Sequence, residues 1–320
     1  MGMELVEKML GGAQRPLSRL ITLVERESPE VPEIMKAVYP YLGKAYTIGV
    51  TGPPGAGKST LADKITTVVR NKGLSVGIIA VDPTSPFTGG AVLGDRIRMQ
   101  QHYLDPQVFI RSMASRGSRG GLPMTTRNVM KLLDAFGKDI VIVETVGVGQ
   151  TELDIMETVD TTIVTLVPEA GDTIQTMKAG LMEIADIFVV NKADRPGADK
   201  LVVELQTMMM LSPRSDDWQS PILATQALND VGITELYEEV EKHEEFLKSS
   251  GELLHKREQQ RKEEFIRAVE QRLRKRLSRL MKDDDKLMAL WAEVERGDID
   301  PYSALEVMED EAVSRGWLGK

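Results

Sequence analysis

The stretch GVTGPPGAGKST, residues 49–60, decides the fold of this chain. Gly52, Gly57, Lys58 and Ser59 match the phosphate-loop pattern G-x-x-x-x-G-K-[ST]. The pattern follows an apolar run and precedes a predicted helix at 59–70, which is the strand–loop–helix context that it requires. Backbone N–H groups of such a loop face a phosphate, while Lys58 neutralises phosphate charge and the Ser59 hydroxyl binds magnesium. An unoccupied glycine-rich turn is the alternative reading.

The predicted contacts with nucleotide extend over the whole loop. They comprise Gly52, Pro53, Pro54, Gly55, Ala56, Gly57, Lys58, Ser59 and Thr60.

Around this loop, apolar runs alternate with helical stretches, which is typical of a parallel, doubly wound α/β sheet covered by helices on both faces. The predicted strands are 46–50, 74–82, 108–113, 139–144, 161–167, 186–191 and 221–225. Two helices are predicted before them, at about 3–25 and 32–42. We therefore expect a P-loop NTPase fold divided into an N-terminal helical extension (1–43), a P-loop nucleotide-binding domain (44–248) and a C-terminal helical arm (249–320).

The sequence NKAD, residues 191–194, follows an apolar strand and indicates which base is bound. A carboxylate at Asp194 can accept hydrogen bonds from guanine N1 and from the exocyclic amine, whereas adenine offers no such pair of donors. Asn191, Lys192 and Asp194 are therefore predicted to read guanine, and a helix N-cap by Asp194 is the alternative. The turn Gln226, Ala227 and Leu228 is expected to place a backbone N–H on the guanine oxygen.

A strand ends in ETVGVGQTE, residues 144–152, where GTPases commonly carry D-x-x-G. Here Glu144 stands at the magnesium-linked position, and Gly147 can offer its N–H to the γ-phosphate. Val148 has no polar group with which to orient a water molecule, so slow intrinsic hydrolysis is expected. Two further acids, Asp82 and Asp95, flank a loop rich in Gly, Pro, Ser and Thr; they are predicted metal-linked acids, with helix caps as the alternative.

Composition excludes several other functions. The 320-residue chain contains no cysteine and only three histidines, His102, His243 and His255, which argues against a Cys- or His-based metal site. A net charge of −9 disfavours extended nucleic-acid binding. The absence of a long apolar run and of a signal-peptide pattern predicts a cytoplasmic protein without a membrane span.

The C-terminal part is helical and highly charged. Apolar residues recur at helical spacing, at Ile266, Val269, Leu273, Leu277 and Leu280. The preceding segment 255–264 carries no apolar side chain, so this helix is either packed with a charged outer face or forms an arm for homodimerisation. A capped helix is predicted to begin near Asp300 and Pro301.

Taken together, these motifs resemble the MeaB/ArgK GTPases, which include the human methylmalonic aciduria type A protein. The resemblance rests on GPPGAGKST, VDPTSPFTGGAVLGDRIRM, SRGSRGGL, ETVGVGQTE, PEAGDTIQTMKAG and NKAD, covers about 45–230 strongly, and extends more loosely to most of the chain.

The resemblance implies a G-protein chaperone that gates adenosylcobalamin loading and protects or reactivates an acyl-CoA mutase, usually methylmalonyl-CoA mutase. It implies that Asp82, Asp95 and Glu144 form an acidic magnesium and catalytic cluster. It also implies a third switch from Glu169 to Lys178, in which Gln175 and Lys178 enter the active site when the mutase is bound.

Two positions depart from the family pattern. Glu169 stands where the family more often has glycine, and Arg119 replaces a small or apolar residue. Arg119 and Arg116 are candidates for stabilising phosphate charge, although a solvated surface arginine is the commoner role.

Three other functions compete with the chaperone. A nickel-insertion GTPase would need the metal-binding cysteines or histidine clusters that this chain lacks. A kinase acting on periplasmic amino-acid-binding proteins would need an acceptor hydroxyl and a base, which no motif indicates. A non-catalytic GTP-binding scaffold is the third alternative.

Overall fold

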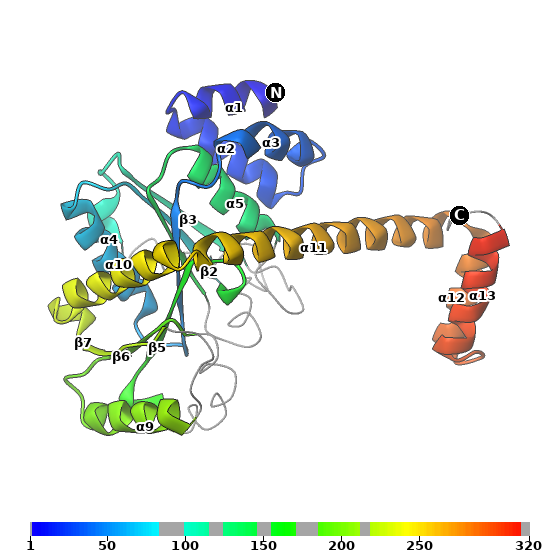
Figure 1. Cartoon of the computed structure of the whole chain (residues 1–320). Coiled ribbons are helices and arrows are strands. Elements are labelled where there is room, and N and C mark those ends of the chain that lie inside the picture. Colours follow the sequence, from blue (N-terminus) through cyan, green and yellow to red (C-terminus); the bar gives the residue numbers. More distant parts are fainter. Residues whose placement is uncertain are drawn as a thin grey trace. The chain divides into compact units, whose positions relative to one another are not determined.

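Seven strands form one parallel sheet in the computed structural model, which describes residues 2–82, 99–114, 124–145, 155–170, 185–211 and 218–314 (Figure 1). The strands are β1 (Tyr46–Thr51), β2 (Val76–Asp82), β3 (Val108–Ala114), β4 (Ile140–Glu144), β5 (Thr161–Leu166), β6 (Ile187–Asn191) and β7 (Ile222–Thr225). Their order is β3-β2-β4-β1-β5-β6-β7, with every neighbouring pair parallel. All seven predicted strands and the predicted fold class are confirmed.

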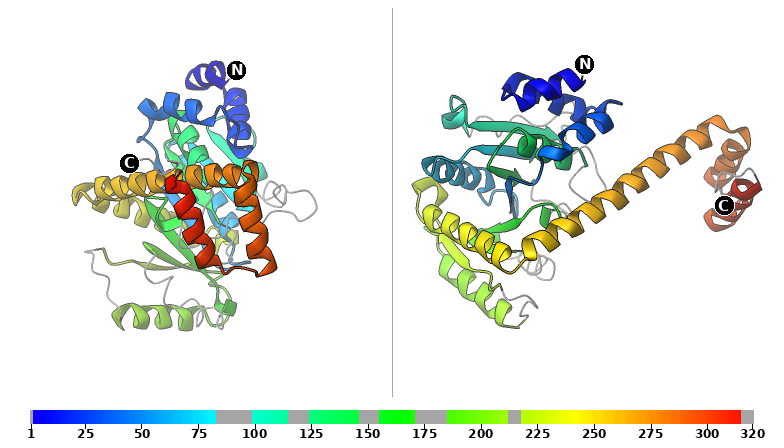
Figure 2. Two further views of the ribbon diagram at one scale, coloured as in Figure 1. Left: turned by 90° about the vertical axis from the view of Figure 1, so that its right-hand side faces the viewer. Right: turned by 45° about the horizontal axis from the view of Figure 1, so that its top comes forward.

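Helices cover both faces of the sheet because both faces of the strands are apolar. On one face, Ile48 and Val50 of β1 pack in a cluster with Leu61 and Ile65 of α4 (Lys58–Asn71) and with apolar residues of α10 (Ile233–Ser249). On the other face, α5 (Met124–Ala135) packs on β2 and β4, and α9 (Ala198–Leu211) packs on β6 and β7. The N-terminal helices and α9 lie toward opposite edges of the sheet (Figure 2).

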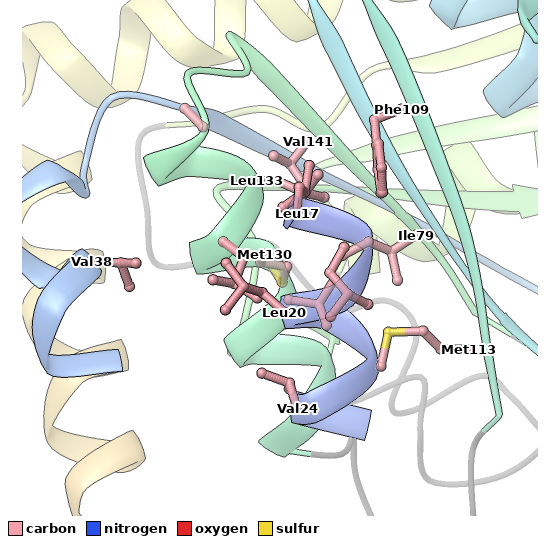
Figure 3. Close-up of a cluster of buried hydrophobic side chains, with 14 of the residues drawn as sticks. Leu17, Leu20, Val24, Val38, Ile79, Phe109, Met113, Met130, Leu133 and Val141 are labelled. Atoms are coloured by element: carbon pink, nitrogen blue, oxygen red, sulfur yellow. The ribbon is translucent and has the colours of Figure 1, made fainter. Parts of the chain in front are cut away.

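The N-terminal helices complete the core on the α5 side. They are α1 (Gly2–Leu10), α2 (Gln14–Glu25) and α3 (Val31–Val38), followed by the short helix η1 (Tyr39–Tyr41). Figure 3 shows Leu17, Leu20 and Val24 of α2 in one cluster with Met130 and Leu133 of α5 and with Ile79, Phe109, Met113 and Val141 of the sheet. These helices therefore share a hydrophobic core with the sheet.

The single helix predicted at 3–25 is wrong in one respect, because the chain breaks it at Gly11 and Gly12. Gly12 has φ +90° and donates its N–H to the carbonyl of Met9, and Ala13 donates to the carbonyl of Lys8. Glycine adopts this left-handed conformation without a Cβ clash and ends a helix there. The predicted helix at 32–42 is likewise shorter, since its last turn is the helix η1.

A carboxylate fixes the segment that leads into β1. Asp134, near the end of α5, accepts hydrogen bonds from the backbone N–H groups of Gly43, Lys44 and Ala45, at 2.6, 3.1 and 2.9 Å. These contacts determine where β1 begins and so where the phosphate loop at its far end lies.

The described chain divides into two compact units, Met1–Lys256 and Arg257–Lys320. α11 (Glu252–Asp283) begins in the first unit, and the second also holds α12 (Asp285–Arg296) and α13 (Pro301–Ser314). Asp300 accepts hydrogen bonds from the N–H groups of Tyr302 and Ser303, which confirms the predicted capped helix start. No helix in the described part of the chain combines the length and apolar character needed to span a bilayer.

Candidate nucleotide-binding site

The loop 52–57 joins β1 to α4 and needs glycine at two positions. Gly52 has φ +135°, and a Cβ there would come within 2.0 Å of the backbone oxygen of Thr165. Gly57 has φ +91°, and its Cβ would come within 2.4 Å of Asn191 Nδ2. Any larger residue would strain the backbone and displace β5 or β6. The phosphate-loop pattern predicted from the sequence therefore has the required strand, turn and helix.

Lys58 and Ser59 are both buried at the start of α4. Lys58 Nζ donates hydrogen bonds to the carbonyl oxygens of Gly52 and Pro53, at 2.8 and 3.0 Å. The ammonium group thus lies over the loop, as expected for a group that binds phosphate there. Ser59 Oγ donates to Glu144 Oε1 at 2.6 Å, which brings together two of the predicted metal ligands.

Asn191 holds the phosphate loop against the base-recognition strands. Its side chain is 2% exposed, and Nδ2 donates to the carbonyl of Ala56 at 2.8 Å. Oδ1 accepts hydrogen bonds from Thr225 Oγ1 and from the backbone N–H of Ala227, each at 3.1 Å. The amide therefore connects the phosphate loop, the end of β7 and the turn that follows it. Sequence reasoning predicted a direct reading of guanine by this residue and did not foresee this connecting role.

The remaining residues predicted to bind the base lie beside Asn191. Lys192 has φ +57°, an uncommon left-handed conformation outside glycine, and Ala193 donates its N–H to the carbonyl of Thr225. Asp194 is exposed and lies four residues before α9 begins at Ala198, so it is not the N-cap of that helix. In the turn 226–228, Ala227 is buried and Leu228 is exposed. The structure thus brings the turn to the same edge of the sheet as NKAD.

Strand register shows where two of the predicted acidic residues, Asp82 and Glu144, lie in the sheet. β2 and β4 are neighbours, with Ala80 opposite Glu144, and β2 ends at Asp82. The carboxyl ends of β2, β4 and β1 therefore meet at one edge, beside the phosphate loop. β1 lies where the strand order reverses, a position at which α/β sheets commonly bind ligands.

Several predicted site residues lie outside the described part of the chain. They are Asp95, Gly147, Val148, Gln175 and Lys178, together with Arg116 and Arg119. Among the residues that the structure describes, no three His, Asp or Glu side chains gather as a metal site.

A hydroxyl and a carboxylate suit magnesium, which prefers hard oxygen ligands and is usually bound with one or two carboxylates and phosphate oxygens. The Ser59–Glu144 pair fits that chemistry, because it places a hydroxyl oxygen and a carboxylate side by side. This pair is buried at the start of the phosphate-loop helix, where a nucleotide would bring its phosphates.

Two polar contacts near the site had not been predicted. Asp63 of α4 lies against Gln101 and His102, and burial raises the pKa of the Asp63 carboxyl. Glu169, which begins the predicted third switch, forms an ion pair with Arg195, directly after NKAD. The hydrogen bond with Arg195 lowers the pKa of the Glu169 carboxyl.

Comparison with known proteins identifies a family model and relatives that match this chain. A protein-family model described as methylmalonyl Co-A mutase-associated GTPase MeaB matches residues 17–282. A Pyrococcus abyssi protein with a GTPase name is 49% identical over 316 residues, covering 98% of this chain and 97% of the relative. GTPase ArgK of Escherichia coli is 36% identical over 290 residues, covering 88% of this chain and 87% of ArgK.

A solved structure described as a LAO/AO transport system kinase resembles the chain with a TM-score of 0.72 and 29% sequence identity. The similarity covers 97% of this chain and 96% of the other. It agrees with the P-loop fold predicted from the sequence.

Proposed function

The chain belongs to the MeaB family of GTPases, and from this membership we propose that it is a G-protein chaperone of an adenosylcobalamin-dependent acyl-CoA mutase. In this proposal, GTP binding and hydrolysis gate loading of the cofactor and protect or reactivate the mutase, with methylmalonyl-CoA mutase as the first candidate. The activity belongs in the cytoplasm and involves neither nucleic acid nor a membrane.

The observation that carries the GTPase part of the proposal is the position of Asn191. Its amide joins the loop that would hold phosphates to the turn that would hold the base. One nucleotide can therefore engage Lys58 through its phosphates and Asp194 through its guanine. A phosphate loop without a base-recognition turn would not indicate which base is bound.

The described residues supply binding and orientation for hydrolysis. Lys58 offers its ammonium group to the phosphates, and Asp194 accepts the two guanine donors. Ser59 and Glu144 would hold Mg²⁺, which supplies positive charge against the phosphates during transfer. In the reaction, a water oxygen bonds to the γ-phosphorus and the bond from that phosphorus to the β–γ bridging oxygen breaks, leaving GDP and inorganic phosphate.

We propose that intrinsic hydrolysis is slow and that the mutase accelerates it. Val148 stands where an amide side chain would orient the water, and it offers no hydrogen bond. Gln175 and Lys178 of the third switch are the residues proposed to complete the site when the mutase is bound.

We also propose that the protein is a homodimer formed through the arm, residues 249–320. Within the described part of the chain, α11 has no buried residue, although it carries an apolar stripe. Leu273 is 60% exposed, and Ile266, Val269 and Leu277 are exposed as well. A second copy of the stripe would remove these side chains from water. Light scattering should report a dimer for the full chain and a monomer for Leu273→Asp/Leu277→Asp; a monomeric wild type would contradict the dimer.

The chaperone proposal is tested by measuring phosphate release from GTP with and without an adenosylcobalamin-dependent acyl-CoA mutase. We expect slow release alone, no use of ATP, and an acceleration of at least about tenfold with the mutase. Gln175→Ala and Lys178→Ala should lose the acceleration, whereas Lys200→Ala, on the exposed side of α9, should keep it.

Two results would contradict this proposal. If no such mutase binds or accelerates the protein, the chaperone role is wrong while the GTPase activity stands. If labelled γ-phosphate appears on a periplasmic amino-acid-binding protein instead of in solution, the kinase alternative is correct.

A further inference from the structure

The turn between β7 and α10, residues 226–232, is closed on itself by backbone hydrogen bonds. We call it the base turn. The N–H of Gln226 donates to the carbonyl of Val231 at 3.0 Å, and the N–H of Val231 donates back at 3.3 Å. Asp230 has φ +57°, a left-handed conformation that Asp adopts more readily than most residues. Gly232 has φ +76°, and a Cβ there would come within 2.7 Å of a backbone oxygen of β7. These contacts fix the shape of the base turn.

The inner side of the base turn packs on the helix of the phosphate loop. Ala227, in the short helix η4 (Ala227–Asn229), is 3% exposed and shares a core cluster with Leu61 of α4. Asn191 connects the same residue to the phosphate loop. α4 and α10 pack against each other on this face of the sheet (Figure 1). The base turn therefore rests on the helix that begins with Lys58.

An ion pair ties the outer side of the base turn to the same helix. Lys64 Nζ lies 2.8 Å from Asp230 Oδ1 and donates to Asp230 Oδ2 at 2.8 Å. Lys64 is six residues after Lys58, so it lies about 9 Å along α4 from the lysine that would bind phosphate. The side chain of Lys64 is 21% exposed and that of Asp230 is 65% exposed. Because such surface pairs contribute little to stability, this one is better suited to positioning the turn than to holding the fold together.

We propose that Lys64 is a positioning residue for guanine recognition. By holding Asp230, it keeps the base turn where an N–H of residues 226–228 meets the oxygen at position 6 of guanine, while the phosphates lie at the start of the same helix. Asp194 accepts the N1 proton and the exocyclic amine from a separate loop. Recognition of the guanine oxygen therefore depends on the Lys64–Asp230 pair, and recognition of the amine does not. This inference rests on the GTP binding proposed above.

The test compares the binding of three nucleotides to the full-length protein by calorimetry. GTP presents the oxygen, the N1 proton and the amine. 6-Thio-GTP has sulfur, a weaker acceptor, in place of the oxygen, and ITP lacks the amine. We expect the wild type to bind GTP about tenfold more tightly than 6-thio-GTP, as for the loss of one hydrogen bond.

Lys64→Met keeps an unbranched apolar side chain and removes the charge. GTP binding should weaken about fourfold, within the range of a surface ion pair, while 6-thio-GTP binding changes by less than about 1.5-fold. The preference for GTP over 6-thio-GTP should therefore fall from about tenfold to about threefold. The ratio of the GTP and ITP affinities should stay at its wild-type value, because it reports on the amine and Asp194.

Variants of the partner separate the ion pair from other effects of changing Lys64. Asp230→Asn removes the charge, keeps the size of the side chain and still tolerates the left-handed backbone, so it should match Lys64→Met. The double variant Lys64→Met/Asp230→Asn should be no worse than the worse single variant, because both remove one contact. Lys64→Arg keeps a cation for the carboxylate and should bind all three nucleotides within about twofold of wild type.

The matched control is an ion pair further along the same helix, between Lys72 and Glu241 of α10. Lys72 Nζ lies 2.6 Å from both carboxylate oxygens, and both side chains are 40% exposed. Lys72 is the C-cap residue of α4, about 12 Å further from the phosphate loop than Lys64. Lys72→Met should leave both affinity ratios at their wild-type values, even where thermal unfolding shows a loss of stability.

The proposal is overturned if folded Lys64→Met and Asp230→Asn keep the wild-type preference for GTP over 6-thio-GTP, or if Lys72→Met lowers it equally. It is also overturned if the preference for GTP over ITP falls in parallel, because the pair would then act on the whole site. A wild-type protein that prefers GTP over ATP but not over 6-thio-GTP would remove the base turn from guanine recognition, and this proposal with it. A wild-type protein that does not prefer GTP over ATP would instead overturn the proposed guanine site on which the inference rests.

Discussion

The two sides of the nucleotide site, on either side of β1, are built differently. On the base side, one amide, that of Asn191, makes three hydrogen bonds to partners on separate elements. On the acidic side, Ser59 donates a hydrogen bond to Glu144, and the other expected acids lie at a strand end or outside the described residues. The comparison teaches that affinity for nucleotide and its turnover depend on different parts of the chain and should be separable by mutation.

The largest expected effect comes from Asp194→Asn on the base side. An amide has one acceptor oxygen and sets an N–H donor against the second guanine proton, so one charge-assisted hydrogen bond is lost and the other is weakened; GTP binding should weaken by about 1,000-fold. Xanthine nucleotides should now bind, and the bound xanthosine triphosphate should be hydrolysed at about the wild-type rate. Calorimetry with both nucleotides measures this change. Asp199→Asn, in the exposed first turn of α9, is the matched control; unchanged GTP selectivity in Asp194→Asn would remove Asp194 from the base site.

Glu144→Gln should have the opposite signature on the acidic side. The amide keeps an oxygen that can accept from Ser59 Oγ, but it removes the charge expected to support magnesium. We expect the hydrolysis rate to fall about 100-fold, while GTP affinity changes by less than about fivefold. Single-turnover hydrolysis measures the rate separately from binding.

The control for Glu144 is its neighbour. Thr145→Val removes the hydrogen bond of Thr145 Oγ1 to Thr51 Oγ1 without changing charge, and the rate should fall by less than about threefold. Equal losses of affinity and rate in Glu144→Gln would contradict the separation of the two sides.

Asn191→Ala tests whether the amide orders the base side in advance of binding. The change removes the partner of the Ala56 carbonyl and of the Ala227 N–H, both buried, and should weaken GTP binding about 30-fold. Thr225→Val removes only one of the three hydrogen bonds and should weaken binding about threefold. Titration of a fluorescent nucleotide measures both; equal effects would contradict a graded contribution from the three bonds.

The sequence was sufficient to predict the features that depend on local patterns. The seven strands follow from apolar runs. The phosphate loop follows from its glycines, because the loop needs a positive φ at those positions. The break of the first helix also had a local signal, Gly11-Gly12, which the prediction of one helix at 3–25 did not use.

Contacts between distant parts of the chain had no such signal. Asp134 accepts hydrogen bonds from residues about 90 positions away, and His102 meets Asp63 across 39 positions. Each partner is an ordinary polar residue in its own segment, so its role depends on the folded arrangement. The use of Asn191 as a connector is of the same kind, because Ala56 is 135 positions away.

The smallest expected effect concerns the ion pair between Glu169, at the start of the predicted third switch, and Arg195, directly after NKAD. Glu169 pairs with Arg195 at the protein surface, and surface ion pairs contribute little to stability. Glu169→Gly, which restores the residue more common in the family, should therefore change GTP affinity by less than about twofold. If Glu169 also holds the start of the third switch near NKAD, the same variant should alter the acceleration by the mutase, and Arg195→Gln should alter it equally. Phosphate release with and without the mutase measures both variants; an effect of Glu169→Gly that Arg195→Gln does not reproduce would assign it to backbone freedom at residue 169 and not to the ion pair.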